Sequence, residues 1–284
     1  PVCKQNIDQH PVKYSRLIAT EACRRAKNSK DFILKVFQET GLKLNIIDTE
    51  EEARLAVISC APLVSSKSEQ LLVVDIGGGS TELVWIDLSA VPSHERPKSI
   101  MRLHSGFHSI ESPFPAARVV DWISVPLGVA TLRDQFNDVE DDAARFALMS
   151  WYFEEKLTDF APYKDNKIDT SFQIIGTSGT VTTVASSHLG LRRYDRTKVD
   201  GLRMTTDQID KVIRSYLEMG PDGRKKDPRI GRDRQALIMS GSAILQAMLR
   251  SWPTDKLTVA DRGLREGLLY AQMSANGVLE DVIL

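Results

Sequence analysis

"VVDIGGGSTELVW", residues 73–85, places three consecutive glycines between two apolar stretches, with Asp75 before them and Ser80 and Thr81 after them. Residues 71–76 (LLVVDI) are apolar apart from the acid near their end, which is typical of a buried strand. Residues 81–88 are rich in the β-branched and aromatic residues that strands favour. The pattern therefore predicts two strands joined by a glycine turn. A dinucleotide-binding GxGxxG motif and a P-loop both open a helix after their strand, so neither describes this stretch.

A glycine turn between two strands can bind phosphate through its backbone. The N–H groups of Gly77, Gly78, Gly79 and Ser80 would form a concave row that phosphate can approach closely, because no Cβ intervenes. The hydroxyls of Ser80 and Thr81 can add donors. A side chain at Gly78 would then obstruct the phosphate oxygens or force disfavoured backbone angles. The alternative is a glycine-rich hairpin that binds nothing.

Two acidic residues beside this turn are candidate metal ligands. Asp75 ends the first strand, where a carboxylate would repel bare phosphate but could bind a magnesium ion that phosphate also binds. We expect Asp75 and Glu82 to hold Mg²⁺ or Mn²⁺, directly or through water.

Composition limits the classes of protein to consider. The chain has 284 residues, of which 42% are apolar and 26% charged, as in ordinary soluble globular proteins. Because 37 basic residues nearly balance 38 acidic ones, an anionic ligand must be attracted by local charge. The three cysteines are at unrelated spacings, which fits a reducing compartment. The sequence has no apolar run of about 20 residues and no signal-peptide core at its start. We therefore expect a cytoplasmic protein without a membrane span.

The rest of the chain alternates helical and strand patterns. We expect helices over 28–41, 49–61, 205–220 and 234–252, a strand over 43–48, and a strand, turn and helix over 256–273. "SFQIIGTSGTVTTVA" (171–185) reads as a strand, a turn and the start of a helix, so Gly176, Ser178 and Gly179 are candidate anion-binding residues. Residues 106–122 are interpreted as an insertion.

Several motifs together resemble one family: "IATEACRRAKNSKDF" (18–32), "EEARL" (51–55), "VVDIGGGSTELV" (73–84), "SVPLGVATL" (124–132), "GTSGT" (176–180), "YDRTKVDG" (194–201) and "ADRGLREGLLY" (260–270). Their order and content are similar to the exopolyphosphatase and guanosine pentaphosphate phosphatase family, within the superfamily of actin, sugar kinases and heat-shock chaperone ATPases. The resemblance runs from about Ala19 to Tyr270.

The resemblance implies an α/β fold of two lobes, each of the ribonuclease H type, with a cleft between them. Residues 1–70 would be the remainder of the first lobe, 71–272 the second lobe, and 273–284 a tail that can return to the first lobe. Family members also have an earlier phosphate loop of the Asp-Ile-Gly-Ser-Asn-Ser type, and this sequence contains no such motif.

The resemblance also implies roles for three further residues. Glu52 corresponds to the family's general base, Arg24 to an arginine that faces phosphate across the cleft, and Arg234 to a second phosphate-binding arginine. The implied reaction is metal-assisted attack of water on the terminal phosphate of polyphosphate or on the 5′ phosphate of guanosine pentaphosphate. The implied partners include neither nucleic acid nor membrane, and a homodimer is compatible with the pattern.

An alternative from another class is a nucleotide- or phosphate-binding regulatory module of the same fold with weak catalysis. The basic stretches 191–198 and 223–234 fit either a track for a polyanion or solvated loops.

Overall fold

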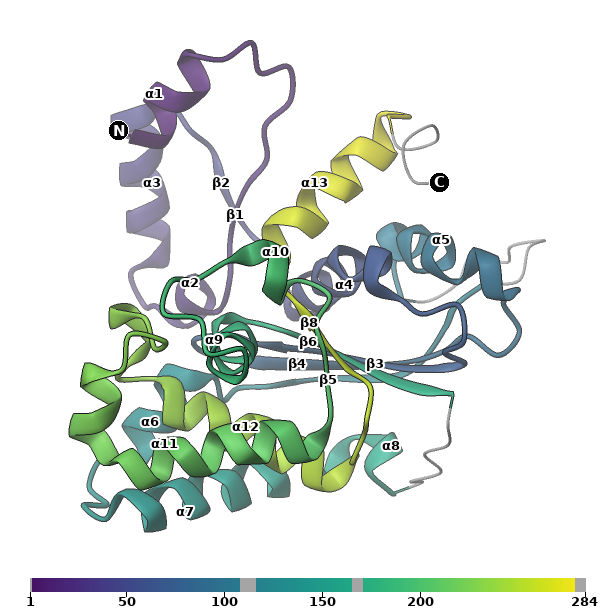
Figure 1. Cartoon of the computed structure of the whole chain (residues 1–284). Coiled ribbons are helices and arrows are strands. Elements are labelled where there is room, and N and C mark those ends of the chain that lie inside the picture. The colour runs from purple at the N-terminus through teal and green to yellow at the C-terminus, as the bar shows by residue number, and fades with distance from the viewer. Residues whose placement is uncertain (1, 108–115, 165–170, 279–284) are drawn as a thin grey trace. The chain divides into compact units, whose positions relative to one another are not determined.

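The computed structural model describes residues 2–107, 116–164 and 171–278. The chain divides into two compact units, Pro1–Glu52 and Ala53–Leu284, and the division falls within helix α4 (Thr49–Ser59). The lobe boundary expected near residue 70 therefore lies inside the second unit. Figure 1 shows the course of the chain.

The first unit contains short elements and little core. Its elements are α1 (Val2–Asp8), β1 (Leu17–Ala19), α2 (Glu21–Arg25), α3 (Ser29–Thr40) and β2 (Leu44–Ile46). Strands β1 and β2 pair in parallel. The predicted helix over 28–41 is confirmed, and Gly41 ends it with a φ of 70°, which glycine adopts without strain. Phe32 and Phe37, however, stay 50% and 51% exposed, so the apolar face of α3 is not covered.

The second unit is built on a six-stranded sheet with the strand order β5-β4-β3-β6-β8-β7. The strands are β3 (Gln70–Ile76), β4 (Thr81–Asp87), β5 (Arg118–Val125), β6 (Phe172–Thr177), β7 (Arg203–Met204) and β8 (Leu257–Ala260). Strands β3, β6 and β8 run parallel, whereas β4, β5 and β7 are antiparallel to their neighbours. The predicted strand, glycine turn and strand over 71–88 are confirmed as the β3–β4 hairpin.

Part of the stretch interpreted as an insertion, residues 106–122, belongs to the sheet. Residues 118–122, assigned to an insertion, begin β5, which pairs with β4 at the edge of the sheet. Strand β5 is at the edge of the sheet and is largely half-buried or exposed. Polar residues such as Arg118 and Asp121 therefore interrupt its apolar pattern, and the sequence does not resemble that of a buried strand. Residues 108–115 of the same stretch lie outside the described residues.

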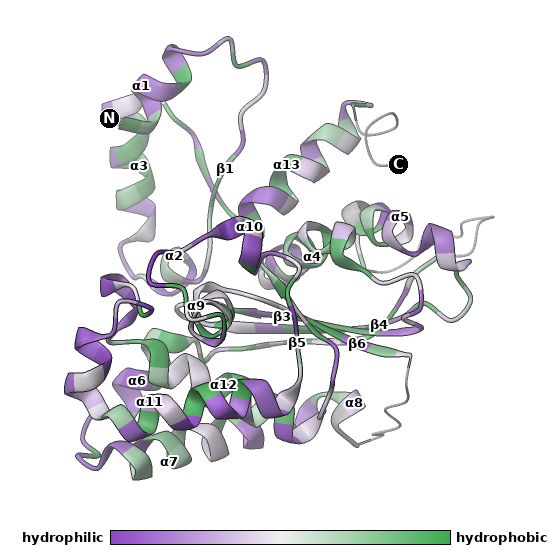
Figure 2. Ribbon diagram, in the orientation of Figure 1, coloured by the Kyte–Doolittle hydropathy of each residue, from purple (hydrophilic) through white to green (hydrophobic). Residues whose placement is uncertain are grey.

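Helices cover both faces of the sheet. Alternate residues of β3 separate two cores: Leu72 and Val74 belong to one, Leu71 and Val73 to the other. The first core is covered by α6 (Val129–Gln135), α7 (Asp142–Glu155), α9 (Gly179–His188), α11 (Thr206–Lys226) and α12 (Ile238–Ser251); the second is covered by α4, α5 (Arg96–Met101) and α13 (Leu264–Ala275). Figure 2 shows hydrophobic residues along the sheet and hydrophilic ones on the outer sides of these helices.

The predicted helices of the second unit are confirmed, with one difference. A capping box between Thr205 and Gln208 begins α11, and the expected inward residues Ile209, Ile213 and Tyr216 are buried. The regular helix ends at Gly220, as predicted, because its φ of 62° is not helical. A second short helix, which begins at Pro221 and continues to Lys226, was not predicted.

Candidate functional site

The glycine turn is held by the first turn of α6. The carbonyl oxygens of Gly77 and Gly78 accept hydrogen bonds from Val129 N and Ala130 N, each 2.9 Å long. A Cβ at Gly128 would overlap Gly77 O and the Gly78 carbonyl, so only glycine permits this approach. The carbonyls of the turn therefore point into the protein.

Two of the hydrogen-bond donors predicted to bind phosphate instead make hydrogen bonds within the protein. Gly77 N donates to Ser80 O at 2.9 Å, and Thr81 Oγ1 donates to Leu127 O at 2.8 Å. The N–H groups of Gly78 and Gly79 donate no backbone hydrogen bond to a described residue. Gly78 does not have a left-handed φ, and a Cβ there would meet nothing within 4 Å. A side chain at Gly78 would thus enter open space without backbone strain.

Asp75 and Glu82 lie side by side on one face of the sheet, but they differ in access. They are directly opposite in the β3–β4 register, and Asp75 is also opposite Thr177 of β6. Asp75 lines a cavity at this end of the sheet. Glu82 is 2% exposed, does not line the cavity, and accepts a hydrogen bond from Ser124 Oγ at 2.9 Å. Of the two, Asp75 is the carboxylate that a ligand can reach.

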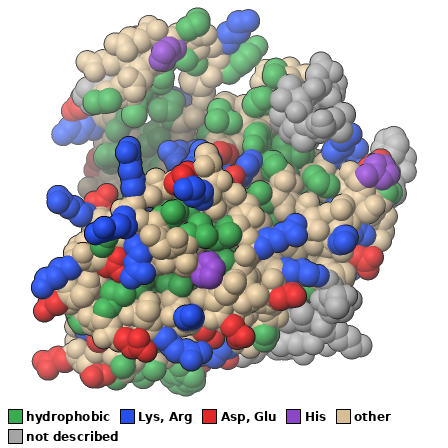
Figure 3. Space-filling model, in the orientation of Figure 1, with side chains coloured by type: hydrophobic (Ala, Val, Ile, Leu, Met, Phe, Trp, Pro, Cys, Tyr) green, Lys and Arg blue, Asp and Glu red, His purple; other side chains and the backbone are tan. Residues whose placement is uncertain are grey.

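This cavity, of about 550 Å³, lies where the parallel strands β3, β6 and β8 end. Its wall is formed by Asp75, the β6–α9 turn, one face of α9, the segment between α11 and α12, and the β8–α13 turn. Ligands of open α/β sheets commonly bind at the carboxyl ends of the strands. Figure 3 shows many Lys and Arg side chains over α10 (Arg196–Val199) and the segment after α11.

The β6–α9 turn presents the N-terminus of a ten-residue helix to the cavity. Ser178 caps it, accepting from Thr180 N and Val181 N, and has a φ of 151° that is unusual for a residue other than glycine. The Arg234 guanidinium lies against Gly179, so closely that a Cβ there would overlap it. Arg234 forms no ion pair with a described residue. Helix N-terminus and guanidinium together favour an anion.

Gly176, in contrast, has a packing role. It lies within β6, does not line the cavity, and a Cβ there would press on Val181 of α9 at 3.2–3.3 Å. Ser178, Gly179 and Arg234 are therefore the predicted binding residues that the structure brings together with Asp75.

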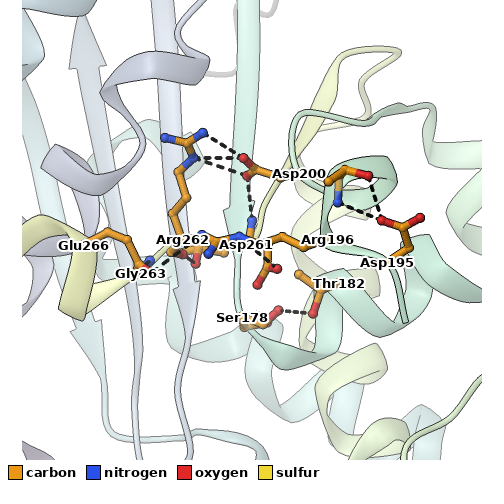
Figure 4. Close-up of polar contacts among 11 residues, drawn as sticks. Ser178, Thr182, Asp195, Arg196, Asp200, Asp261, Arg262, Gly263 and Glu266 are labelled. Carbon is orange, nitrogen blue, oxygen red and sulfur yellow. Dashed lines mark hydrogen bonds and ion pairs between the residues drawn. The ribbon is translucent and has the colours of Figure 1, made fainter. Parts of the chain in front are cut away.

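The β8–α13 turn is fixed by Asp200 (Figure 4). Asp200 accepts from Arg262 Nη2 at 2.8 Å and from Asp261 N at 3.0 Å, and Thr177 Oγ1 donates to Arg262 O. The hydrogen bond with Asp200 raises the pKa of Arg262 above its ordinary value. Arg262 is thus occupied in holding the turn. The sequence marked "YDRTKVDG" and "ADRGLREGLLY" as landmarks, but it did not show that they meet.

Tyr194 stands beside the same turn. Burial raises the pKa of Tyr194, and the adjacent Asp261 carboxylate raises it further, whereas Thr182 lowers it. Arg196 donates to Asp261 O at 2.6 Å and lies 3.4 Å from the Asp261 carboxylate. The cavity therefore offers a protonated phenol next to an arginine-paired carboxylate, a feature that the sequence did not single out.

In the first unit, the predicted base and the predicted arginine contact each other. Arg24 Nη2 donates to Glu52 Oε2 at 2.7 Å, and Arg24 Nη1 donates to Ile47 O at 2.9 Å. Burial lowers the pKa of Arg24, but the bonds and charges of Glu52 and Glu21 outweigh it and raise that pKa. The neighbouring Glu51 pairs with Arg16 at 2.7 Å.

Within the described ranges, no three His, Cys, Asp or Glu side chains gather as a metal-binding group. None of the described helices has both the length and the apolar character that crossing a membrane requires.

A mixed sheet with a glycine hairpin and a polar cavity at the ends of its parallel strands defines an α/β protein of the actin-like ATPase class, as the sequence predicted. The chain belongs to the Ppx/GppA phosphatase family, whose family model matches residues 2–276.

Individual relatives agree with this assignment. The chain is 25% identical over 272 residues to a guanosine-5′-triphosphate,3′-diphosphate pyrophosphatase of Aeromonas salmonicida, a match that covers 96% of this chain and 47% of that protein. The chain thus spans about half the length of this curated relative. The crystal structure of the Aquifex aeolicus Ppx/GppA family member has 29% identity and a TM-score of 0.73, covering 97% of this chain and 79% of that one. An exopolyphosphatase from Cytophaga hutchinsonii, at 20% identity, has a TM-score of 0.76 over 96% of this chain and 78% of its own and shares the fold.

Proposed function

We propose that this chain is a phosphoanhydride hydrolase that releases the terminal phosphate of inorganic polyphosphate, the 5′ phosphate of guanosine pentaphosphate, or both. Membership of a phosphatase family supports the proposal, as does a relative named for hydrolysis of guanosine-5′-triphosphate,3′-diphosphate. The observation that carries it is the arrangement of Arg234 and the N-terminus of α9 in the same cavity as the Asp75 carboxylate.

The residues of the cavity fit a phosphate chain accompanied by a hard cation. Magnesium usually binds through one or two carboxylates, substrate phosphates and several waters, and Asp75 offers such a carboxylate. Mg²⁺, or Mn²⁺, would neutralise charge on the phosphate oxygens. Glu82, being buried opposite Asp75, would support that carboxylate rather than contact the substrate.

The chain's own groups have distinct tasks in the proposed reaction. Arg234 and the α9 N-terminus hold the phosphates that do not react, and the N–H groups of Gly78 and Gly79 contact oxygens of the phosphate that does. Glu52 accepts the proton of the attacking water. Arg24 keeps the Glu52 carboxylate oriented through its 2.7 Å hydrogen bond.

The replacement Glu52→Gln tests the assignment of the base. We expect it to slow Mg²⁺-dependent phosphate release from polyphosphate by about 10²–10⁴-fold while KM changes little. Glu50→Gln, in the same first turn of α4, is the matched control and should retain activity. An active Glu52→Gln variant would contradict the role of Glu52, and a parent chain that releases no phosphate from either substrate would contradict hydrolysis.

One observation favours the second candidate, a phosphate-binding regulatory module. Glu52 Oε2 already accepts a hydrogen bond from Arg24, so this oxygen is engaged within the protein. Binding of guanosine pentaphosphate by the parent chain without any release of phosphate would support this candidate.

A further inference from the structure

The cavity at the strand ends continues along helix α9. Thr182, Thr183 and Ser186 line it and lie one and two turns beyond the Ser178 cap. At a rise of about 1.5 Å per residue, the lined stretch from Ser178 to Ser186 is about 12 Å long. Tyr194, from the segment that follows α9, lines the same cavity. We call Thr182, Thr183, Ser186 and Tyr194 the α9 subsite.

The two threonines of the α9 subsite present hydrogen-bond acceptors to the cavity. Thr182 Oγ1 donates to Ser178 O at 2.9 Å, as Figure 4 shows, and Thr183 Oγ1 donates to Gly179 O at 2.6 Å. A hydroxyl has a single proton, so what remains for a ligand is its lone pairs. The inner phosphates of a polyphosphate chain carry acceptor oxygens only and cannot donate to them. The threonines therefore fit a ligand group that has O–H or N–H donors.

Ser186 lacks a protein partner although it is buried. It is 2% exposed, and its hydroxyl makes no hydrogen bond to a described residue. Because buried hydroxyls normally have a partner, the partner of this one has to come from the cavity.

Tyr194 adds an aromatic surface to the subsite. The segment after α9 turns back along the helix, since Leu191 N donates to Ser186 O at 3.0 Å, and the Tyr194 phenol lies beside Thr182 and Asp261. The side chain is thus positioned at its polar end, while the residue stays 48% exposed. A ring of this kind offers a surface on which a planar base can stack.

Two arginines of the cavity differ in the charge that they offer a ligand. Arg234 lies against Gly179 at the start of α9 and forms no ion pair with a described residue. Arg229 also lines the cavity, but its Nε donates to both carboxylate oxygens of Asp227, at 2.9 and 3.0 Å. Phosphates are therefore favoured at the start of α9, and the α9 subsite suits an uncharged group that can donate hydrogen bonds.

We infer that the α9 subsite binds the nucleoside of a nucleotide substrate, whose phosphates lie at the start of α9 and at Arg234. Ribose hydroxyls and base N–H groups supply the donors that the threonines accept, and the base stacks on Tyr194. The cavity volume, about 550 Å³, is within the usual range of small-molecule sites. The inference rests on the proposed function and selects guanosine pentaphosphate from its two substrates.

Two ligands with equal numbers of phosphates, guanosine 5′-triphosphate and inorganic tripolyphosphate, test the inference. In calorimetric titrations of the full chain, with EDTA present to prevent metal-dependent hydrolysis, the nucleotide should bind at least about tenfold more tightly. Tyr194→Leu should reduce this preference by at least about fivefold, whereas Tyr194→Phe, which keeps the ring, should retain it. Ser186→Ala should reduce the preference by about two- to tenfold. Tyr14→Leu replaces a 68% exposed tyrosine that does not line the cavity, and this matched control should keep the preference.

Equal affinity for the two ligands, binding of neither, or a preference that Tyr194→Leu leaves unchanged would overturn the inference. Phosphate release from polyphosphate by the parent chain with Mg²⁺ reports separately on the proposed function. Release without a preference for the nucleotide would refute the subsite alone, and a preference without release from either substrate would refute hydrolysis alone. A thermal melt of each variant should match that of the parent, which separates loss of binding from loss of folding.

Discussion

Glycines that look alike in the sequence do different things at the residue scale. Gly78 borders open space, whereas Gly128 is required because the glycine turn packs directly on it. The sequence predicted the turn from residues 73–85, but it could not predict that α6 would hold the carbonyls, since those partners lie some fifty residues further along the chain.

This contrast gives a prediction for two substitutions. Gly78→Val should leave the free energy of unfolding near that of the parent and weaken binding of the substrate phosphates by at least about tenfold, the effect of one lost charge-assisted hydrogen bond. Gly128→Ala should cost about 1–3 kcal/mol of stability, because its Cβ overlaps the turn. Urea denaturation and the KM for polyphosphate measure the two effects. A Gly78→Val variant that folds and binds like the parent would make the turn a structural hairpin.

Four residues that the sequence marked as candidate ligand-binding residues lie together in the structure. Asp75, Ser178, Gly179 and Arg234 were each marked by the sequence, and all four line one cavity. Gly176 was marked with them because it belongs to the same motif. Successive residues of a strand face opposite sides of the sheet, so Gly176 faces away from the cavity that the next residue, Thr177, lines. The bond between Arg24 and Glu52 joins residues 28 positions apart, so neither motif alone could show it.

At the scale of elements, periodicity and capping signals predicted the helices well, as α3 and α11 show. Strand β5 and the helices α6 and α7 were not recognised. Strand β5 is an edge strand with polar residues facing out, and α6 has only seven residues, too few for a clear helical period. Glycine is a usual C-terminal signal, and Gly220 does end the regular helix, but the short helix that follows it was not recognised.

The turn of α11 beyond Gly220 is fastened to α7 by one ion pair. Arg224, with a side chain 5% exposed, donates to both carboxylate oxygens of Asp142 at 2.7 and 2.8 Å, and also to Tyr216 O. The segment that follows carries Arg229 and Arg234 to the cavity. Arg224 and Asp142 therefore position the arginines without lining the cavity themselves.

We expect Asp142→Asn to lower the free energy of unfolding by about 1.5–3 kcal/mol, because a buried guanidinium loses its charged partner. It should also raise KM more than it lowers kcat, since the wall that carries Arg234 is loosened. Asp138→Asn, an exposed residue before α7, is the matched control for the loss of one charge. A stable Asp142→Asn variant with an unchanged KM would show that the pair does not position the wall.

At the scale of the whole second unit, the sheet separates two cores, and each contains a buried group that can ionise. Cys60 is 0% exposed and lies in the core under α4, and Tyr216 is 0% exposed and lies in the core under α9 and α11. Burial raises the pKa of Cys60 to about 12; the Ser59 hydroxyl lowers it and the Asp75 charge raises it. Burial likewise raises the pKa of Tyr216 to about 12, against a smaller opposing effect of Ser187.

These raised pKa values predict that the unit loses stability in alkali in two stages. In the unfolded chain the Cys60 thiol loses its proton near pH 9, whereas in the folded chain it keeps that proton to about pH 12. The folded state therefore binds more protons above pH 9, and the free energy of unfolding should fall by about 1.4 kcal/mol per pH unit for this one group. Above pH 10 the Tyr216 phenol adds a similar slope.

Urea denaturation at intervals from pH 8 to 10.5, in reducing buffer, measures both slopes. Cys60→Ala should remove the slope between pH 9 and 10, and Tyr216→Phe only the added slope above pH 10. A Cys60→Ala variant that keeps the full slope between pH 9 and 10 would show that ionisation of the Cys60 thiol is not coupled to unfolding.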